Sequence, residues 1–305
     1  MKRTGSAYQP SGRLYYIARS LERASHFRED QAWIEAAVAR TETLFAPYWR
    51  GRLLIEQQPR LRAVLNARPV QTGNAVFLGL FDGVAAFAVD LSEHDKPMEA
   101  LRNARGAFLE LRSISSALPA EEAGLLATAK GLLCWQSRHR FCGVCGAPCS
   151  IERAGHLMKC MGCTAQHFPR IDPAVIMLVY KNEQLLLGQS NKFAIEQNFF
   201  STLAGFVEPG ESLENAVRRE VLEEVGLQVG TISYIASQPW PFPSSLMLGF
   251  RAEALNEEIV LDKREMRAAR WFSKAEIAGR ESAGFSLPPL DSIARHLIEE
   301  FLLEI

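Results

Sequence analysis

Residues 205–227 read GFVEPGESLENAVRREVLEEVGL, and this stretch carries the clearest structural signal in the 305-residue chain. Ser212 can cap a helix that begins near Leu213, because a serine oxygen accepts a hydrogen bond from the N–H groups of a first helical turn. Gly226 can end the same helix in the left-handed conformation that glycine adopts without strain. The stretch therefore predicts a glycine-containing loop followed by one helix.

Three glutamates of this predicted helix fall on one flank. Glu220 lies four residues before Glu224 and three before Glu223, spacings that bring side chains together on a helix surface. Arg219 precedes Glu223 by four residues and can orient it by a forked hydrogen bond. The other flank is apolar and faces the core, so the acidic side chains are not forced into it; its members are Leu213, Ala216, Val217, Val221 and Val225.

The clustered carboxylates indicate a divalent cation. Hard oxygen ligands select Mg²⁺ or Mn²⁺, ions that also bind the phosphate oxygens of a substrate. The alternative is an acidic helix face that is simply solvated. The fixed spacing of Gly205, Glu211, Arg219 and the glutamates disfavours that alternative. We therefore expect phosphate chemistry at this helix.

The same residues follow the pattern G-x5-E-x7-R-E-U-x-E-E-x-G-U, in which U is a bulky aliphatic residue. This pattern is the Nudix box, so the chain resembles the Nudix hydrolases. The resemblance implies an α/β fold, with an α/β/α sandwich around a mixed sheet. It also implies hydrolysis of a nucleoside diphosphate linked to another group. In the mechanism that we expect, Glu211 supports either the loop or a water molecule near the metal, and Arg219 orients the acidic cluster.

Two CxxC pairs predict a structural zinc ribbon, with the four ligands Cys142, Cys145, Cys160 and Cys163. Four thiolates form a closed tetrahedral site that leaves no position for a catalytic water. Free thiols or a redox pair are the alternative, which paired knuckles at this spacing disfavour. Cys149 either replaces a ligand or is a free thiol, and the symmetry of the pairs favours the free thiol. Cys134 fits a small buried side chain on a helix.

Length and composition predict a folded protein of two or three compact units. We expect an N-terminal α/β domain over residues 1–118, a linker helix and zinc ribbon over 119–170, and the catalytic domain over 171–305. The 34 basic and 35 acidic residues predict no strong non-specific attraction to nucleic acid or membrane. No apolar run approaches the length of a membrane span, and a cytoplasmic location is expected.

Hydrophobic periodicity predicts several further elements. Helices are expected at Gln31–Ala46 and Pro119–Gln136, and strands at Leu53–Glu56, Ala75–Leu91, Ala174–Tyr180 and Gln184–Gln189. Asp82-Gly83 is typical of a hairpin turn within the second of these strand regions. The N-terminal region carries no chemical motif, so we expect it to serve packing or dimerisation.

The segment SQPWPFPSS, residues 237–245, holds three prolines and two aromatic rings. Such a segment either presents its rings as a stacking platform for a base or packs them inside the protein. It is similar to the signature of NADH pyrophosphatases. Further similarities are the zinc ribbon, the lead-in at 135–142, residues 168–173 and residues 292–295, so the resemblance covers about residues 105–300.

Carried over by position, the resemblance implies that Mg²⁺ or Mn²⁺ is bound by Glu220, Glu224, Glu265 and the carbonyl of Ala204. It places Phe168 and Phe206 where a base is sandwiched, and Arg112 matches a family substrate contact or is a surface arginine. The other implied substrate-contacting residues are Gln238, Pro239, Trp240, Pro241, Phe242, Pro243, Ser244, Ser245 and Ala294. Family resemblance also implies a homodimer.

The resulting hypothesis is hydrolysis of the diphosphate of NADH or NAD⁺ to NMN(H) and AMP, with Glu223 or Glu224 accepting the proton of the attacking water. One alternative is removal of a 5′-NAD cap from RNA, for which the near-zero net charge gives no support. A second is a zinc-ribbon binding protein with an inactive Nudix domain, which the intact acidic set disfavours. A third, hydrolysis of ADP-ribose, is disfavoured by the SQPWPFPSS segment.

Overall fold

The computed structural model describes residues 14–191 and 198–303, and these residues divide into two compact units. The N-terminal unit combines Tyr15–Asp172 with Pro239–Ser245. The C-terminal unit contains residues 173–238 and 246 onward, together with Leu14. The chain therefore leaves the C-terminal unit for the last seven residues of the SQPWPFPSS segment and returns to it at Leu246. The three-part division of the sequence stays a prediction.

The N-terminal unit is built on a seven-stranded sheet in the order β1-β6-β7-β2-β3-β4, with β9 added to β3. Strand β2 runs parallel to β7, and the other pairs of this sheet are antiparallel. The strands are β1 Leu21–Glu22, β2 Leu44–Trp49, β3 Arg52–Glu56, β4 Arg62–Ala63, β6 Val76–Phe81, β7 Val84–Asp90 and β9 Ala107–Leu109. A separate short pair joins β5 Arg68–Pro69 to β8 Leu101–Arg102.

Alternation along the strands gives this sheet two apolar faces. Val76 and Leu78 of β6 pack in one core cluster with α3 (Ala120–Arg138), whereas Phe77 packs in the other with α1 (Gln31–Ala39). The two helices therefore cover opposite faces. The remaining helical segments are the 3₁₀ turns η1 Ser25–Glu29, η2 Pro97–Ala100 and η3 Ser115–Ala117 and the short α2 Leu111–Ile114.

The β6–β7 hairpin confirms the predicted turn, since Asp82 and Gly83 have φ of 48° and 81° as a type I′ turn requires. The predicted helix over Gln31–Ala46 is wrong beyond Ala39. Its last residues enter β2, where Leu44 and Phe45 pair with Ala86 and Phe87 of β7. Aromatic side chains and Pro47 favour a strand there, and Pro47 is incompatible with a continuing helix.

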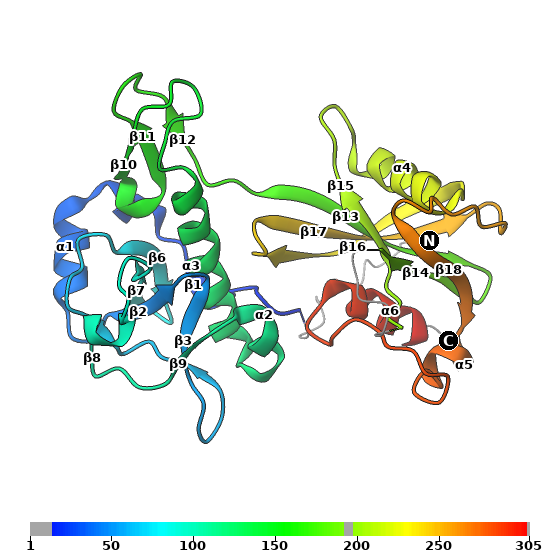
Figure 1. Cartoon of the computed structure of the whole chain (residues 1–305), viewed down its shortest axis with the longest axis horizontal. Coiled ribbons are helices and arrows are strands. Elements are labelled where there is room, and N and C mark those ends of the chain that lie inside the picture. The colour runs from blue at the N-terminus through cyan, green and yellow to red at the C-terminus, as the bar shows by residue number, and fades with distance from the viewer. Residues whose placement is uncertain (1–13, 192–197, 304–305) are drawn as a thin grey trace, which may run out of the picture. The chain divides into compact units, whose positions relative to one another are not determined.

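The cysteine-rich segment forms a three-stranded antiparallel sheet, β10-β11-β12, at the end of α3 (Figure 1). Its elements are β10 Cys149–Glu152, the 3₁₀ turn η4 Arg153–Gly155, β11 Leu157–Cys160 and β12 Gln166–His167. Helix α3 begins after Pro119 and confirms the predicted connecting helix.

The C-terminal unit holds a six-stranded sheet in the order β16-β17-β13-β14-β18, with β15 paired to β13. Its strands are β13 Asp172–Lys181, β14 Gln184–Ser190, β15 Leu203–Phe206, β16 Val229–Trp240, β17 Ser245–Ala254 and β18 Met266–Ser273. Its helices are α4 Leu213–Val225, α5 Lys274–Ala278 and α6 Ile293–Leu303. Strands β13 and β14 confirm the predicted pair and meet in the register Tyr180 to Leu185.

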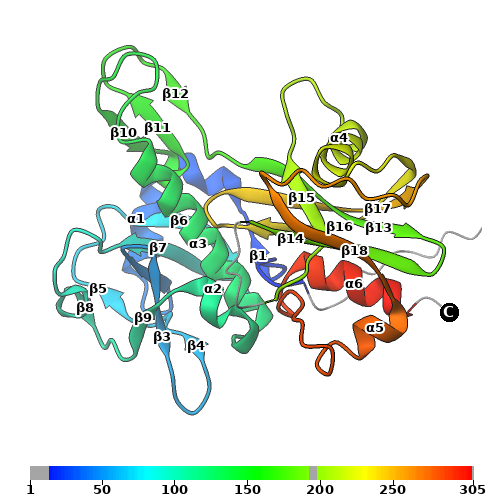
Figure 2. The same cartoon turned by 45° about the vertical axis from the view of Figure 1, so that its right-hand side comes forward.

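Helices α4 and α6 lie on opposite faces of this sheet, as Figure 2 shows. Phe250 of β17 packs in the core cluster with the apolar residues of α4. The preceding Gly249 faces the other way, where an added Cβ would lie 3.0 Å from Ile293 Cδ1 of α6. The predicted α/β/α sandwich is therefore confirmed. No helix among the described residues is long and apolar enough to cross a membrane.

Candidate active site

Helix α4 begins and ends at the predicted residues. The Ser212 side chain accepts a hydrogen bond from Asn215 N at 3.2 Å, and Gly226 closes the helix with φ of 71°. The apolar flank packs into the core through Ala216, Val217, Val221 and Val225. These contacts fix the rotation of the helix, and with it the direction of the acidic residues.

The acidic flank is more buried than the sequence predicts. Glu220 and Glu224 are each only 8% exposed, whereas Glu223 is exposed to solvent. Strand β15 accounts for the burial of Glu220, because an added Cβ on Gly205 would lie 1.9 Å from its carboxyl carbon. The backbone thus approaches this carboxylate so closely that only glycine fits.

Arg219 joins the loop, strand β15 and the acidic residues. Its Nε and Nη2 donate to the two oxygens of Glu211 at 2.7 and 2.9 Å, and Nη2 also donates to Phe206 O at 2.8 Å. Nη1 donates to Glu220 at 2.8 Å and to Glu223 at 3.1 Å. The fork was expected on Glu223 but falls on Glu211, because the loop carries Glu211 across the guanidinium plane.

Arg219 stabilises the ionised form of Glu211. Its hydrogen bonds, helped by the Glu208 N–H, lower the pKa of Glu211 to about 2. For Glu220, burial raises the pKa, and the bonds from Arg219 oppose that effect without cancelling it. The charges of Glu223 and Glu265 raise it further. Several carboxylates thus repel one another beside a single arginine.

Glu265 reaches this group through a loop that is bonded to the end of α4. Val260 N donates to Val225 O at 2.9 Å, and Asp262 N donates to Glu224 O at 3.1 Å. Glu265 N in turn donates to Asp262 O at 3.1 Å. The side chain of Asp262, held by Arg264, was not singled out in the sequence, because an Asp and an Arg two residues apart also occur as ordinary surface pairs.

The carboxylates of this region are the donor type that a hard divalent cation prefers. Glu220, Glu224 and Glu265 offer only carboxylate oxygens, and their mutual repulsion is relieved by positive charge. Ala204, expected to add its carbonyl, is exposed on β15 opposite Ile176.

The four predicted cysteines come together. Their sulfur atoms all lie within 4.8 Å of one another, with Cys142 to Cys163 at 3.7 Å and Cys145 to Cys160 at 3.4 Å. Backbone N–H groups of Val144, Gly162 and Cys163 point at sulfur, as in metal-binding knuckles. Cys149 lies opposite Cys160 in the sheet but outside this group. The four-cysteine cluster is confirmed.

His167 is a neighbour of the cluster that the sequence analysis missed. Its Nε2 lies 3.3 Å from Cys142 Sγ. The spacing of the cysteines gives no signal for it, because the contact is made across the fold from β12.

The aromatic rings of the SQPWPFPSS segment pack inside the N-terminal unit. Trp240 and Phe242 both meet Tyr16 edge to face, with ring centroids 5.6 and 5.5 Å apart. Arg112 lies over the Trp240 ring at 5.6 Å, and Lys130 lies over Phe242 at 5.7 Å. These contacts favour the packing interpretation over a free stacking platform for both rings.

The side chain of Gln238 also forms its hydrogen bonds within the protein. It is fully buried in the C-terminal unit, where its side chain donates to Asp291 O and accepts from Ile293 N, both at 2.7 Å. Ser244 donates to Asp172 at 2.8 Å. Of the other residues expected to contact substrate, Pro241 and Ala294 are buried, Ser245 is partly buried, and Pro239 and Pro243 are exposed.

Phe168 and Phe206 differ from the packed rings. They are 54% and 60% exposed, unusual for side chains of this size. Phe206 lies on β15, and its carbonyl is held by Arg219. Both rings are therefore available to a planar ligand.

Comparison with known proteins agrees with this geometry. The Nudix domain family matches residues 170–301, and the NADH pyrophosphatase-like rudimentary Nudix domain matches residues 42–135. The protein named NAD-capped RNA hydrolase NudC from Stutzerimonas stutzeri is 44% identical over 225 residues, which are 74% of this chain and 76% of that protein. Human NAD-capped RNA hydrolase NUDT12 is 42% identical over 200 residues, which are 61% of this chain and 43% of the human protein.

Among solved structures, a Nudix hydrolase from Nitrosomonas europaea covers 52% of this chain and 91% of its own, with 24% identity and a TM-score of 0.43. The family follows from the two domain matches and from the S. stutzeri relative, which matches this chain over about three quarters of both proteins. The chain belongs to the Nudix hydrolases and carries an NADH pyrophosphatase-like domain ahead of its Nudix domain.

Proposed function

We propose that this chain hydrolyses the diphosphate bond of NAD(H), both as the free dinucleotide and as the 5′ cap of RNA, and releases NMN(H) from the adenylate. The observation that carries the proposal is the arrangement around Arg219, which holds Glu211, Glu220 and Glu223 beside a strand that fits closely over Glu220. The names of the relatives supply the substrate class.

In this proposal Glu220, Glu224, Glu265 and the Ala204 carbonyl hold Mg²⁺ or Mn²⁺. Such ions neutralise the diphosphate oxygens and make an attacking water more acidic. Glu223 or Glu224 accepts the proton of that water. Glu223 is the more accessible of the two, and its contact with Arg219 limits its side-chain freedom. Arg219 keeps the acidic residues in one arrangement while the substrate binds and leaves.

The exposed rings of Phe168 and Phe206 serve in this proposal as stacking surfaces for the bases of the substrate. Trp240 and Phe242 instead stabilise the segment that carries them. Both rings are already in edge-to-face contact with Tyr16. We therefore assign base stacking to the two exposed phenylalanines and not to Trp240 or Phe242.

The four-cysteine cluster is proposed to bind Zn²⁺ in a structural role. Four sulfur ligands suit this ion and close its coordination shell. The ribbon strands are short and carry few apolar residues, so the metal supplies much of their folding free energy. We also propose a homodimer in the cytoplasm, where thiols stay reduced; light scattering of the purified protein tests the dimer.

The decisive experiment compares NADH, NAD⁺, NAD-capped RNA and ADP-ribose as substrates with Mg²⁺ or Mn²⁺, resolving the products by chromatography. Reaction in ¹⁸O-labelled water is expected to place the label in AMP, because attack occurs at the adenylate phosphorus. Label in NMN(H) would move the attack to the other phosphorus. If ADP-ribose reacts fastest, the substrate assignment fails. If none of the substrates is cut by folded protein, an inactive binding protein becomes the better interpretation.

A further inference from the structure

Glu265 differs from the other acidic residues of the candidate site because its side chain has no fixed partner. Burial raises the pKa of Glu220, and the charge of Glu265 raises it further, so the two carboxylates lie close enough to repel one another. The Glu265 side chain is exposed, and it forms no hydrogen bond or ion pair with residues 14–191 or 198–303. The position of this carboxylate therefore depends on the backbone that carries it.

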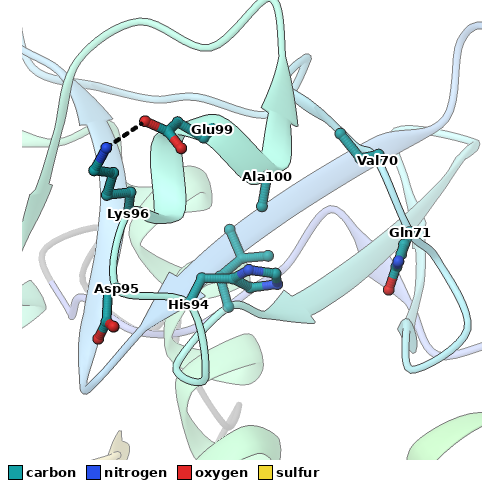
Figure 3. A pocket seen from close by; sticks show the side chains of 8 residues that line it. Val70, Gln71, His94, Asp95, Lys96, Glu99 and Ala100 are labelled. Carbon is teal, nitrogen blue, oxygen red and sulfur yellow. Dashed lines mark ion pairs between the residues drawn. The ribbon is translucent and has the colours of Figure 1, made fainter.

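Two acidic residues of the N-terminal unit show the contrast. They line a cavity of about 460 Å³, where Glu99 pairs with Lys96 at 3.1 Å and Asp95 pairs with Arg50 at 3.0 Å. Figure 3 shows the first of these pairs. Because a basic side chain already neutralises each carboxylate, this cavity gives no reason to expect a metal ion. Glu265 has no such neighbour to neutralise it.

The arginine next to Glu265 in the sequence is bound to another carboxylate. Arg264 Nε donates to Asp262 Oδ1 at 3.0 Å, and Nη2 donates to Asp262 Oδ2 at 2.6 Å. The backbone N–H of Arg264 also donates to Asp262 Oδ1, at 2.9 Å. Since Asp262 holds this guanidinium by both of its oxygens, the charge of Glu265 stays available to a cation that is not part of the chain.

A β-bulge between β14 and β18 brings Asn191 beside Glu265. The register of the two strands shifts by one residue between Gln189 and Ser190, and Ser190 then lies opposite Met266. Asn191 follows, and its N–H donates to Glu265 O at 2.8 Å. Without the shift, Asn191 would lie opposite Met266, whose side chain is buried. Bulges often redirect a side chain next to an active site, and this one aligns Asn191 with the loop that carries Glu265.

The side chain of Asn191 holds the turn that precedes Glu265. Its Nδ2 donates to Lys263 O and to Arg264 O, both at 3.0 Å. Both acceptors are carbonyl oxygens, so a side chain must offer N–H or O–H groups to satisfy them. Together with its backbone N–H, Asn191 therefore bonds three successive residues of the loop. An alanine would keep the backbone bond alone.

We propose that Asn191 is a positioning residue for Glu265: its side-chain amide fixes the turn at residues 263–265, so that the Glu265 carboxylate stays beside the acidic residues of α4. The inference rests on the proposed function, in which Glu265 is a ligand of Mg²⁺ or Mn²⁺. Asn191 acts through the loop backbone and does not itself bind the ion. Residues that hold a metal ligand in place in this way commonly determine how tightly the ion binds.

The test is a double-mutant cycle on Mn²⁺ binding, measured without substrate from the electron paramagnetic resonance signal of the free ion. Asn191→Ala is expected to raise the Kd for Mn²⁺ by at least about 10-fold. In protein that already carries Glu265→Gln, the same change should alter the Kd less than about 2-fold, because no carboxylate is left to position. Asn256→Ala is the control. It removes a hydrogen bond from Gln228 N elsewhere in the C-terminal unit and should bind Mn²⁺ as the wild type does.

Equal weakening by Asn191→Ala in the presence and absence of Glu265→Gln would overturn the proposal, because the loss would then not pass through Glu265. Unchanged Mn²⁺ binding by Asn191→Ala would also overturn it. So would wild-type binding no tighter than that of Glu265→Gln, since Glu265 would then not be placed as a ligand. The titrations are made well below the melting temperature of each variant, so that unfolded protein does not contribute to the measured Kd.

Kinetic measurements separate this inference from the proposed function. With NADH, the Mn²⁺ concentration for half-maximal activity should rise about 10-fold in Asn191→Ala, while KM for NADH at saturating Mn²⁺ stays within about 2-fold. If the wild-type protein cuts no substrate, the proposed function fails, and weaker Mn²⁺ binding by Asn191→Ala than by Asn256→Ala still supports the positioning role. If NADH is cut and the two variants depend on Mn²⁺ equally, the positioning role alone fails.

Discussion

Arg219 holds Glu211 by two parallel hydrogen bonds, from Nε at 2.7 Å and from Nη2 at 2.9 Å. The same guanidinium reaches Phe206 O on β15 and the carboxylates of Glu220 and Glu223 on α4. One planar group thus ties the loop, the strand and the helix of the candidate site together. A lysine has no equivalent set of donors in fixed directions.

Arg219→Lys is therefore expected to lower kcat about 10- to 100-fold while the charge of the site stays the same. The ammonium group of lysine has three N–H donors and cannot bond all five oxygen atoms that accept from Arg219, so the side chains of Glu211 and Glu220 gain freedom to move. Steady-state kinetics with NADH measures the effect. The neighbouring Arg218 is exposed, so Arg218→Lys is the control and should leave kcat within about 2-fold. Equal activities of the two variants would contradict the positioning role of Arg219.

Glu224→Gln is expected to reduce turnover by at least about 100-fold, because it removes a carboxylate that binds metal or accepts a proton. The amide keeps the size of the side chain, so little loss of stability is expected. Glu214→Gln changes an exposed glutamate in the first turn of the same helix and should retain activity. Near wild-type kcat in Glu224→Gln would refute the assignment.

Gly205→Ala tests the fit of β15 over the acidic cluster. The added methyl would lie 1.9 Å from the Glu220 carboxyl carbon, so either the strand or the carboxylate must move. We expect kcat to fall at least about 10-fold and the Mn²⁺ concentration for half-maximal activity to rise, because the metal ligands lose their geometry. Gly131→Ala, where an added methyl meets no atom within 4 Å, is the matched control. Full activity with unchanged metal affinity would show that the close approach has no functional role.

The helix and its boundaries were predictable because they depend on local chemistry. Ser212 caps the helix by accepting a hydrogen bond from a residue three positions away, and Gly226 ends it through its own left-handed conformation. The spacing of the apolar residues in α4 determines which face is buried. The four cysteines were predictable for a similar reason, since two knuckles need one shared ion.

Other features depend on residues distant in the sequence. The fork from Arg219 goes to Glu211 because the loop folds back, and helical spacing cannot show this. Tyr16 receives Trp240 and Phe242 from more than 220 positions away, so the sequence alone left stacking and packing both open. Residues 40–46 resemble a helix continuation, but pairing with β7 draws Leu44 and Phe45 into a strand. Tertiary contacts override local preference in these places.

Cys160→Ser is expected to cost stability more than chemistry, because the ribbon folds around its metal. The melting temperature should fall by at least about 5 °C and the bound zinc should be lost, whereas kcat per folded molecule stays within about 3-fold. Cys149→Ser is the control, since Cys149 lies outside the four-sulfur group, and it should retain zinc. An unchanged melting temperature with complete loss of zinc from Cys160→Ser would contradict the structural role.

His156 gives the N-terminal unit a pH-dependent stability. Burial lowers its pKa to about 4, below the ordinary value of 6.5, so the unfolded chain takes up this proton before the folded chain does. The contribution of the neutral imidazole to the free energy of unfolding is complete above pH 6.5, falls as the pH drops, and is lost by about pH 4. This contribution is at most about 3 kcal/mol. His156→Gln can still donate to Phe77 O but cannot titrate, so its free energy of unfolding should fall less steeply between pH 6.5 and 4. Denaturant titrations at several pH values measure this difference, and because both proteins share the same cysteines, acid loss of zinc cancels. Parallel stability curves for the two proteins would show that the folded state accepts the charge on His156 without cost.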